Sequence, residues 1–330
     1  MRQPAGRSLP ERSITIDDVR AAADRIAGHV NRTPVLTSHV LDDRAGARLF
    51  FKCENFQSAG AFKARGATNA VMQLSDADAA NGVVTHSSGN HAAALARAAR
   101  IRGIAAHIVM PSNSPSAKIA ATERYGGHVI LCEPTLEARE STASAVQAET
   151  GATLIHPYDD PRVMAGQGTV ALELLTDIAD LDAVVCPVGG GGLLSGTAVV
   201  VRALAPSARV LAAEPAAADD AARSFAAGRL IPLDHTTTVA DGLRTSLSDR
   251  TFAHLVRDVD EVVTVGEDEI IDAMRLLWNV LKAVIEPSGA VSYAAVVRAK
   301  ERLAGLRIGV IVTGGNLDLD RLPWQHSTGE

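Results

Sequence analysis

Cysteine is scarce in this sequence. Its three cysteines, Cys53, Cys132 and Cys186, lie far apart in 330 residues, and no two of them have the two-residue spacing of zinc sites or dithiol redox motifs. This excludes a small scaffold stapled by disulfides, because such scaffolds are short and rich in cysteine. We therefore expect three reduced cysteines in a hydrophobic core.

An excess of positive charge is also absent. Lys and Arg total 32 against 38 for Asp and Glu, which gives a net charge of -6. Because nucleic-acid binding depends on neutralising phosphates with a basic surplus, we do not expect DNA or RNA as a partner. The N-terminal residues 1–13 are polar and lack the apolar stretch of a secretory signal, so we expect a cytoplasmic protein.

Long hydrophobic runs are almost absent. The single long uncharged run, 184–201, approaches the length of a bilayer span. Pro187 and the glycines 189–192 interrupt it, and a strand, a glycine loop and the start of a helix explain it better than a membrane span does. We expect no contact with a membrane.

Apolar residues, by contrast, make up 47% of the chain and follow a repeating pattern. Short Val- and Ile-rich strands alternate with helical segments over 83–156, and the same pattern returns over 182–313. Strands that alternate with helices favour parallel sheets covered on both faces. The sequence predicts an α/β fold with two open, mostly parallel, twisted sheets and helices on both faces of each.

The length of the chain favours one large domain or two coupled domains. Between the two series, residues 156–169 read HPYDDPRVMAGQGT, and their prolines and glycines suit a connection rather than the interior of an element. We expect a small domain over 76–160 and a large domain formed by 1–75 and 161–330. The strand-like segment LFFKCE near residue 50 must join one of the two sheets, but the sequence does not say which.

A run of four glycines, Gly189, Gly190, Gly191 and Gly192, follows a buried-type strand and precedes an apolar helix. Glycines at a helix N-terminus leave room and free N–H groups for a phosphate, although they also suit a simple tight turn. The spacing does not fit the dinucleotide fingerprint, and no Walker lysine follows. A phosphate ligand other than NAD or a nucleoside triphosphate is indicated.

Only five lysines occur, and Lys63 differs from the others. It lies in SAGAFKARGA, between Phe62 and small residues, where its amine could be partly desolvated and its pKa lowered, as imine chemistry requires. The alternative is a surface lysine at the start of a helix. A second candidate segment is the loop with Ser87, Ser88, Gly89 and Asn90, which lies between a strand end and a helix. It could bind a carboxylate through helix N-terminal N–H groups, or simply cap the helix.

These segments belong to a longer series of motifs. In order along the chain they are RTPV, FFKCENFQ, FKARGA, VVTHSSGNHAAA, AGQGT, PVGGGGLLSG, AAEP, ADGL, IEPSGA and VTGGN. The series resembles the serine racemase and serine/threonine dehydratase group of the fold-type II pyridoxal 5'-phosphate enzymes. The resemblance runs from about Arg32 to Leu319, which is nearly the whole chain.

The resemblance implies a cofactor site in the cleft between the two domains. Lys63, after Phe62, would form the imine with pyridoxal 5'-phosphate, and Gly189 to Gly192 would cradle its phosphate. Asn90 would bind the cofactor's ring oxygen. The hydroxyl of Thr313 would face the pyridine nitrogen, and because a neutral hydroxyl cannot keep that nitrogen protonated, elimination would be favoured over transamination.

The resemblance also implies residues that contact the substrate. Ser87, Ser88, Gly89, Asn90 and His91 would clamp its α-carboxylate. Ser88 is in addition the second acid or base of racemases, on the opposite face of the substrate from the lysine.

Two further features of the resemblance have simpler alternatives. Arg139 matches an arginine that reaches the second carboxylate of a dicarboxylate ligand, or else it is a solvated arginine paired with Glu137 or Glu140. Glu214, Asp220 and the carbonyl of Ala218 match ligands of a divalent cation, Mg²⁺ or Ca²⁺, or else the two carboxylates are solvated charges.

The function implied is β-elimination from a β-hydroxy amino acid such as serine, threonine or 3-hydroxyaspartate, which gives a 2-oxo acid and ammonia. Serine racemisation is the main alternative. A nicotinamide-dependent dehydrogenase and a non-catalytic pyridoxal-binding regulator are remote ones. The resemblance also implies a homodimer and a small amino acid as the substrate.

Overall fold

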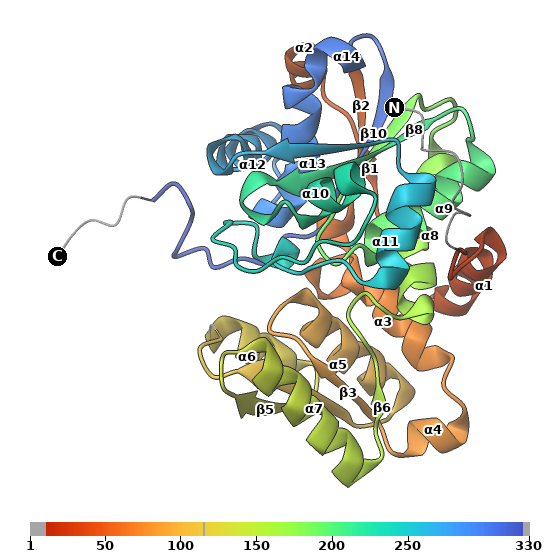
Figure 1. Cartoon of the computed structure of the whole chain (residues 1–330), viewed down its shortest axis with the longest axis vertical. Helices are drawn as coiled ribbons and strands as arrows, with labels where there is room; N and C mark the ends of the chain where they lie inside the picture. Colours follow the sequence, from red (N-terminus) through yellow and green to blue (C-terminus); the bar gives the residue numbers. More distant parts are fainter. Residues whose placement is uncertain (1–10, 115, 326–330) are drawn as a thin grey trace.

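Two β-sheets form the framework of the computed structural model, which describes residues 11–114 and 116–325 (Figure 1). The six-stranded sheet has the order β1-β2-β10-β7-β8-β9, and the four-stranded sheet has the order β5-β4-β3-β6. Every pairing is parallel except that of β1 with β2. The predicted α/β fold with two mostly parallel sheets is confirmed. The polar N-terminus on which the cytoplasmic expectation depends lies mostly outside the described residues.

The strands are β1 Val35–Leu36, β2 Arg48–Cys53, β3 Val83–His86, β4 Ala106–Pro111, β5 His128–Cys132, β6 Thr153–Leu154, β7 Ala183–Pro187, β8 Arg209–Pro215, β9 Glu261–Val265 and β10 Arg307–Val312. The α-helices are α1 Ile16–Ile26, α2 His39–Ala45, α3 Lys63–Met72, α4 Asp76–Ala80, α5 Asn90–Arg102, α6 Ser116–Arg124, α7 Leu136–Thr150, α8 Pro161–Asp177, α9 Gly192–Leu204, α10 Asp220–Ala227, α11 Asp249–Asp258, α12 Glu267–Leu281, α13 Pro287–Arg298 and α14 Lys300–Leu303. Short 3₁₀ turns include η3 Ala216–Ala218 and η4 Asp241–Leu243.

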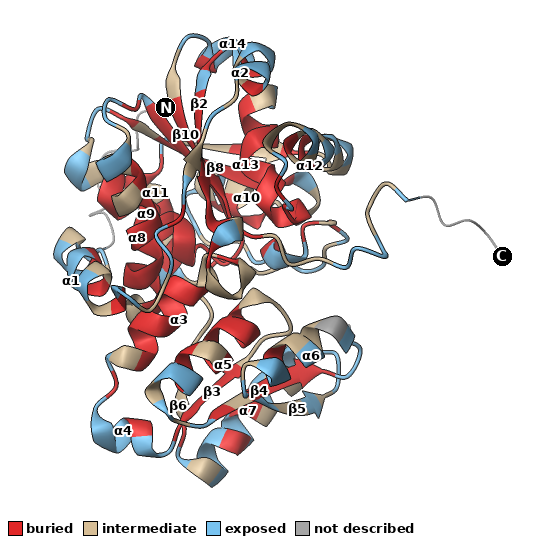
Figure 2. Cartoon of the chain, turned by 180° about the vertical axis from the view of Figure 1, so that it is seen from behind, coloured by how far each residue is buried: buried red, intermediate tan, exposed pale blue. Residues whose placement is uncertain are grey.

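Alternation along each strand gives the six-stranded sheet two separate cores. Phe51 and Val185 face α12 and α13, whereas Phe50 and Val184 face the side covered by α8 and α9. Side chains alternate between the faces of a strand, so a strand that is apolar at every position must be covered on both sides. Figure 2 shows the result as a continuous buried region through the strands of this sheet and through α8, α9 and α13.

The segment LFFKCE forms most of β2, and β2 belongs to the six-stranded sheet. It pairs in parallel with β10, the last strand of the described residues, with Phe51 opposite Val310. Two strands far apart in the sequence are therefore neighbours inside the large sheet, whose edges are β1 and β9.

The four-stranded sheet is built from one continuous stretch of sequence. Its strands β3, β4, β5 and β6 all lie within the range 76–160 that the sequence predicts as the small domain. Val83 of β3 packs against α3 and α5, and Val84 packs on the opposite face with α7. The sheet is thus covered on both sides, and Figure 1 shows it in the lower part of the molecule.

The prediction that residues 156–169 form a connection is wrong for most of its length. Only 156–160 are a connection, because α8 begins at Pro161, with Asp160 as its N-cap. Proline suits this first helical position, since its missing N–H would have no helical partner there. The glycines of AGQGT lie inside the helix and serve helix packing rather than a turn.

Those glycines let three helices approach closely. A Cβ placed on Gly166 would lie 2.7 Å from the Cα of Gly66 in α3, and one placed on Gly196 in α9 would lie 2.8 Å from the Cα of Gly168. Small residues at a crossing allow backbones to touch, so α8 lies directly between α3 and α9. This contact brings the N-termini of α3 and α9 to the same region of the molecule.

The remaining expectations on burial are met in part. Cys53 and Cys186 are buried and Cys132 is half-buried, and all three are free. Cys132 is therefore not a core residue, because it ends β5 at the edge of the small sheet.

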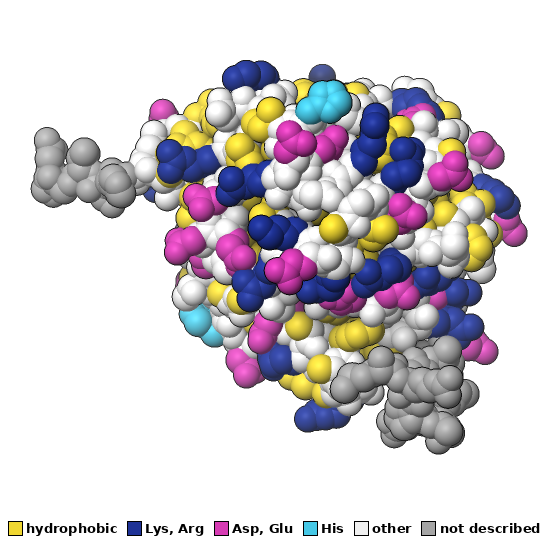
Figure 3. All heavy atoms as spheres, turned by 90° about the horizontal axis from the view of Figure 1, so that it is seen from above, with side chains coloured by type: hydrophobic (Ala, Val, Ile, Leu, Met, Phe, Trp, Pro, Cys, Tyr) yellow, Lys and Arg dark blue, Asp and Glu magenta, His cyan; other side chains and the backbone are white. Residues whose placement is uncertain are grey.

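In the part of the chain that the structure describes, no helix has both the length and the apolar character needed to cross a membrane. Acidic and basic side chains are intermixed over the face of the molecule in Figure 3.

Candidate active site

Lys63 is the first residue of α3, and its amine is held inside the protein. The Nζ atom donates a hydrogen bond of 2.7 Å to the carbonyl oxygen of Pro157, and it lies 5.1 Å from the centre of the Phe62 ring. Burial lowers the pKa of the Lys63 amine to about 8. Lys63 is half-buried, and its amine has a larger neutral fraction at neutral pH than an ordinary lysine has.

The four glycines form the turn from β7 into α9. Gly191 is the N-cap of α9 and has φ of +86°, a conformation that favours glycine. A Cβ on Gly190 would lie 2.4 Å from the Tyr158 ring, and one on Gly189 would lie 2.9 Å from the Cα of Leu243. The turn is therefore fitted tightly against its neighbours. The N–H groups of the first turn of α9 have no partners within the helix and could bind an anion.

Lys63 and the glycine turn are brought together by the connection between β6 and α8. Pro157 accepts the hydrogen bond from Lys63, and the next residue, Tyr158, covers Gly190 and Gly192. An amine that can bond to an aldehyde thus lies beside a turn that can hold a phosphate.

Asn90, the first residue of α5, links the two sheets. Its Nδ2 donates to Oε1 of Glu286 at 2.8 Å, and its Oδ1 accepts from Nδ2 of Asn316 at 2.9 Å. Glu286 and Asn316 belong to the part of the chain that follows the small domain. The second hydrogen of the Asn90 amide remains available for a ligand.

The serines before Asn90 lie in a half-buried loop. Ser87 Oγ accepts a hydrogen bond from the N–H of Gly89, while Ser88 makes no hydrogen bond to any described residue. A Cβ on Gly89 would meet nothing within 4 Å, so there is open space in front of the loop. The imidazole of His91 is instead turned inward, with Nε2 3.2 Å from the carbonyl oxygen of Ile155. Only the backbone of His91 can take part in the predicted carboxylate clamp.

Thr313 follows β10 and is buried, and its hydroxyl has no hydrogen-bond partner among the described residues. Its carbonyl oxygen accepts a bond of 3.0 Å from the N–H of Phe62, which places the residue next to Lys63 in the fold. This buried hydroxyl is therefore available to hydrogen-bond a ligand.

Glu286 is a site residue that the sequence analysis missed. Its carboxyl group is buried, and burial, together with the charge of Asp241, raises its pKa to about 8. The carboxyl group is therefore mainly protonated at neutral pH. The motif IEPSGA could have indicated it. Its glutamate lies between an apolar residue and a helix-starting proline, which suggests a buried carboxyl group.

Comparisons with known proteins identify the family. A family model described as pyridoxal-phosphate dependent enzyme matches residues 26–314. The chain belongs to this family. It is 55% identical over 310 residues to a beta-hydroxyaspartate dehydratase from Paracoccus denitrificans, covering 94% of this chain and 98% of that protein. It is 50% identical to a serine racemase from Oryza sativa subsp. indica, covering 94% of this chain and 93% of that protein. The structure of maize serine racemase superposes with a TM-score of 0.90 at 49% identity, covering 93% and 94% of the two chains.

Membership of this family confirms the predicted resemblance and the predicted cofactor, pyridoxal phosphate. The predicted enzyme class, an ammonia-lyase with possible racemase activity, agrees with the relatives, which are dehydratases and racemases. The nicotinamide-dependent alternative is wrong, because the family model is that of pyridoxal-phosphate enzymes. The residues found at the site fit the cofactor: a desolvated amine, a glycine turn at a helix N-terminus and a buried hydroxyl without a partner.

Arg139, in the first turn of α7, has no carboxylate partner among the described residues. Its Nε donates only to the carbonyl oxygen of Thr135 at 3.4 Å, so the alternative of an ion pair with Glu137 or Glu140 is not found. The pKa of His86, at the end of β3, is lowered mainly by burial and next by the charge of Arg139. The guanidinium is therefore close to the end of β3, where the Ser87 loop begins.

The predicted cation ligands are buried rather than solvated. Both oxygens of Glu214 accept N–H groups of α10, from Ala221 and Ala222, at 2.8 Å. Asp220 accepts the N–H of Leu247 with Oδ2, while its Oδ1 is buried without a partner. No group of three or more His, Cys, Asp or Glu side chains is arranged for metal binding in the described part of the chain. The cation therefore stays a prediction.

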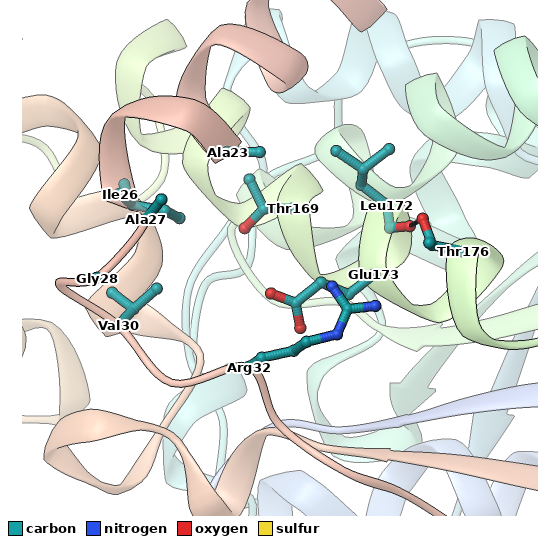
Figure 4. Close-up of a pocket in the computed structure, with 10 residues that line it drawn as sticks. All are labelled: Ala23, Ile26, Ala27, Gly28, Val30, Arg32, Thr169, Leu172, Glu173 and Thr176. Atoms are coloured by element: carbon teal, nitrogen blue, oxygen red, sulfur yellow. Dashed lines mark hydrogen bonds between the residues drawn. The ribbon is translucent and has the colours of Figure 1, made fainter.

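A separate pocket of about 370 Å³ lies between α1 and α8 (Figure 4). Glu173 and Arg32 both reach it, and the Glu173 carboxylate also pairs with the buried Arg65 and Lys52 at 2.7 Å and 2.6 Å. Arg65 in turn pairs with the buried Glu54 at 2.8 Å. The pocket thus adjoins a buried ion network and not the candidate active site.

Proposed function

We propose that this protein removes water from 3-hydroxyaspartate, or from a similar β-hydroxy amino acid with a second carboxylate, by pyridoxal-phosphate-dependent β-elimination. The products are a 2-oxo acid and ammonia. The observation that carries the proposal is the desolvated Lys63 amine beside the glycine turn at the N-terminus of α9. The dehydratase from P. denitrificans, whose name refers to this substrate, supports the choice of the dicarboxylate.

In this mechanism Lys63 would bond to the aldehyde of the cofactor and would also act as the base at the substrate. When bound, pyridoxal phosphate withdraws electrons from the Cα of the substrate, which makes the α-proton acidic. The freed Lys63 amine would take that proton, and burial, which lowers its pKa in the cofactor-free protein, favours the neutral form that can act as a base. The electron pair left on Cα would form the double bond to Cβ as the β-hydroxyl group leaves with the proton taken by Lys63, so that water is lost. The released enamine would tautomerise to an imine, which adds water and gives the 2-oxo acid and ammonia.

Gly189 to Gly192 and the first turn of α9 would hold the phosphate, and the unpartnered Thr313 hydroxyl would meet the ring nitrogen. Asn90 would orient the ring through the free hydrogen of its amide. The open space at Gly89 and the unbonded Ser88 would accept the α-carboxylate. With these roles, the substrate Cα would lie between the Ser87 loop and Lys63.

Arg139 would bind the second carboxylate. Its guanidinium has no acidic partner among the described residues and affects the pKa of His86, next to the Ser87 loop. A guanidinium binds a carboxylate with paired, charge-assisted hydrogen bonds, which serine or threonine as a substrate cannot offer.

The role of Lys63 is tested by replacing it. In Lys63→Ala we expect loss of the visible absorbance of the bound cofactor and loss of 2-oxo acid formation. Lys300→Ala, which removes an exposed lysine of α14, is the matched control and should behave as the wild type. If Lys63→Ala kept both properties, the proposal would be wrong.

The substrate is tested at Arg139. We expect Arg139→Met to lower kcat/KM for 3-hydroxyaspartate by about 10- to 100-fold, the size of one charge-assisted interaction, and to change kcat/KM for serine by less than about threefold. An equal loss of kcat/KM for both substrates would show that Arg139 does not bind the second carboxylate.

Serine racemisation is the second candidate, because Ser88 carries a free hydroxyl and a serine racemase is 50% identical to this chain. Ser88 would return a proton to the face of the substrate opposite Lys63. Ser88→Ala should then abolish racemisation while elimination from one enantiomer continues, which chiral analysis of the remaining substrate measures. If the wild-type protein shows no racemisation, the second candidate is wrong and β-elimination is the activity that remains.

We also propose a divalent cation at Glu214, Asp220 and the Ala218 carbonyl, with a structural role. The buried, unpartnered Oδ1 of Asp220 supports it. Treatment with a chelator should lower the melting temperature, and Mg²⁺ or Ca²⁺ should restore it. An unchanged melting temperature after complete removal of metal would count against the cation.

A further inference from the structure

His156 lies in the connection between β6 and α8, and one nitrogen of its ring accepts hydrogen bonds from the backbone of this connection. Nδ1 accepts the N–H of Asp159 at 2.9 Å and lies 3.3 Å from the N–H of Tyr158. A nitrogen that accepts two N–H groups carries its lone pair and no proton, so the ring proton must be on Nε2. The hydrogen bonds of the turn therefore favour the neutral tautomer with its proton on Nε2.

Each of the next four residues contacts a different part of the molecule. Pro157 accepts the hydrogen bond from Lys63, and Tyr158 covers the glycine turn. Asp159 pairs with Arg250 of α11 at 2.8 Å, and Asp160 caps α8. The conformation of one short turn thus sets the position of the Lys63 acceptor and of the aromatic cover over the phosphate cradle.

We propose that His156 is a positioning residue for the reaction, and that its Nδ1 holds the turn so that Pro157 meets Lys63 and Tyr158 covers the glycines. This inference rests on the proposed function of Lys63. It concerns a residue with no predicted role, which acts through the backbone and touches neither cofactor nor substrate in the assignment above. Without an acceptor at Nδ1, two N–H groups of a half-buried turn lose their partner, and the turn must rearrange to satisfy them.

The surroundings of His156 keep its ring neutral. Burial and then His86, whose ring is 5.7 Å away edge to face, lower the pKa of His156 to about 4. Lys63 lowers it further, while Asp159 and Asp160 oppose the shift, and the Tyr158 ring packs at 4.6 Å. At neutral pH the acceptor on Nδ1 is thus always present.

The test uses two amides that imitate different ring nitrogens. The side-chain oxygen of Asn reaches the position of Nδ1, whereas that of Gln reaches the position of Nε2. We expect His156→Asn to bind pyridoxal 5'-phosphate within about threefold of the wild-type Kd, measured by titrating the apoprotein and following visible absorbance. We expect His156→Gln to weaken binding about tenfold or more, which corresponds to one or two lost hydrogen bonds. His128→Gln, on the exposed side of β5, is the control and should match the wild type.

A second measurement does not depend on cofactor or activity. In ¹⁵N spectra of histidine-labelled apoprotein, His156 should appear as the Nε2–H tautomer at pH 7. A proton on Nδ1, equal cofactor binding by His156→Gln and the wild type, or an Asn variant as weak as the Gln variant would each overturn the inference. Full activity of Lys63→Ala would instead remove the proposed function and leave the tautomer result unaffected, so the two failures are distinguishable.

Discussion

Gly66 of α3 and Gly166 of α8 face each other so closely that neither position has room for a methyl group. A Cβ on Gly166 would lie 2.7 Å from the Cα of Gly66 and 2.8 Å from the Arg65 carbonyl oxygen. Since Lys63 is in the first turn of α3, this contact helps to set the distance between Lys63 and the connection that precedes α8.

Gly166→Ala should therefore lower both stability and activity. Because the clash is with backbone atoms, we expect a loss of about 1–3 kcal/mol in the free energy of unfolding, as for other overpacked cores. Urea denaturation measures it. Gly266→Ala is the control, since that N-cap glycine has φ of -77° and its nearest neighbour is 3.4 Å away. Equal stability of Gly166→Ala and the wild type would mean that the helices can separate freely.

The buried ion network around Arg65 should respond strongly to the loss of one charge. Arg65 pairs with Glu54 and Glu173, and these carboxylates raise the pKa of Arg65 although burial acts against it. Removing one partner of a buried pair costs about 3–5 kcal/mol, so we expect a loss of that size in Arg65→Met. Thermal unfolding is the measurement. Arg20→Met, in an exposed pair with Asp17, should change little.

Glu286 should make stability fall as pH rises. Its pKa is raised from the ordinary value to about 8 in the folded protein, so the folded state retains a proton that the unfolded chain releases. The contribution of this group is fully present below about pH 4.5, the ordinary value, and is lost as pH rises to about 8. Glu286→Gln keeps the neutral shape, so its free energy of unfolding should decline less between pH 5 and pH 8 than that of the wild type. Parallel profiles would show that Glu286 is ionised when folded.

Lys118 of α6 should shift that profile. It pairs with Asp241 of η4, and its charge lowers the pKa of Glu286. In Lys118→Met we expect the fall in stability to extend to higher pH, and we expect no such shift when Glu286→Gln is already present. Denaturation curves of the two single variants and the double variant test this coupling. A shift that persists in the double variant would point to another group.

Local patterns in the sequence predicted the framework well. Alternating apolar strands such as LFFKC and AVVCP are buried on both faces, and that pattern does not depend on distant residues. Lys63 and the glycine run could be selected for the same reason, since each stands out among its own neighbours. Geometry supports both, although their roles remain predictions.

Features that depend on contacts between distant segments were not predictable. Gly166 and Gly168 look like turn residues until their partners Gly66 and Gly196 are known. The role of His156 depends on one ring nitrogen, and the protonation of Glu286 depends on burial by several elements. Whether Arg139 has an acidic partner is likewise a property of the folded chain alone.

The pairing of β2 with β10 has a consequence for folding during synthesis on the ribosome. The small sheet is encoded in one block and is complete once β6 has emerged, so it can fold while synthesis continues. β2 is made earlier, but one of its edges stays unpaired until β10 has been made. Phe62, next to Lys63, donates its N–H to the carbonyl oxygen of Thr313 just after β10, so Lys63 gains its final surroundings only after β10 has been made.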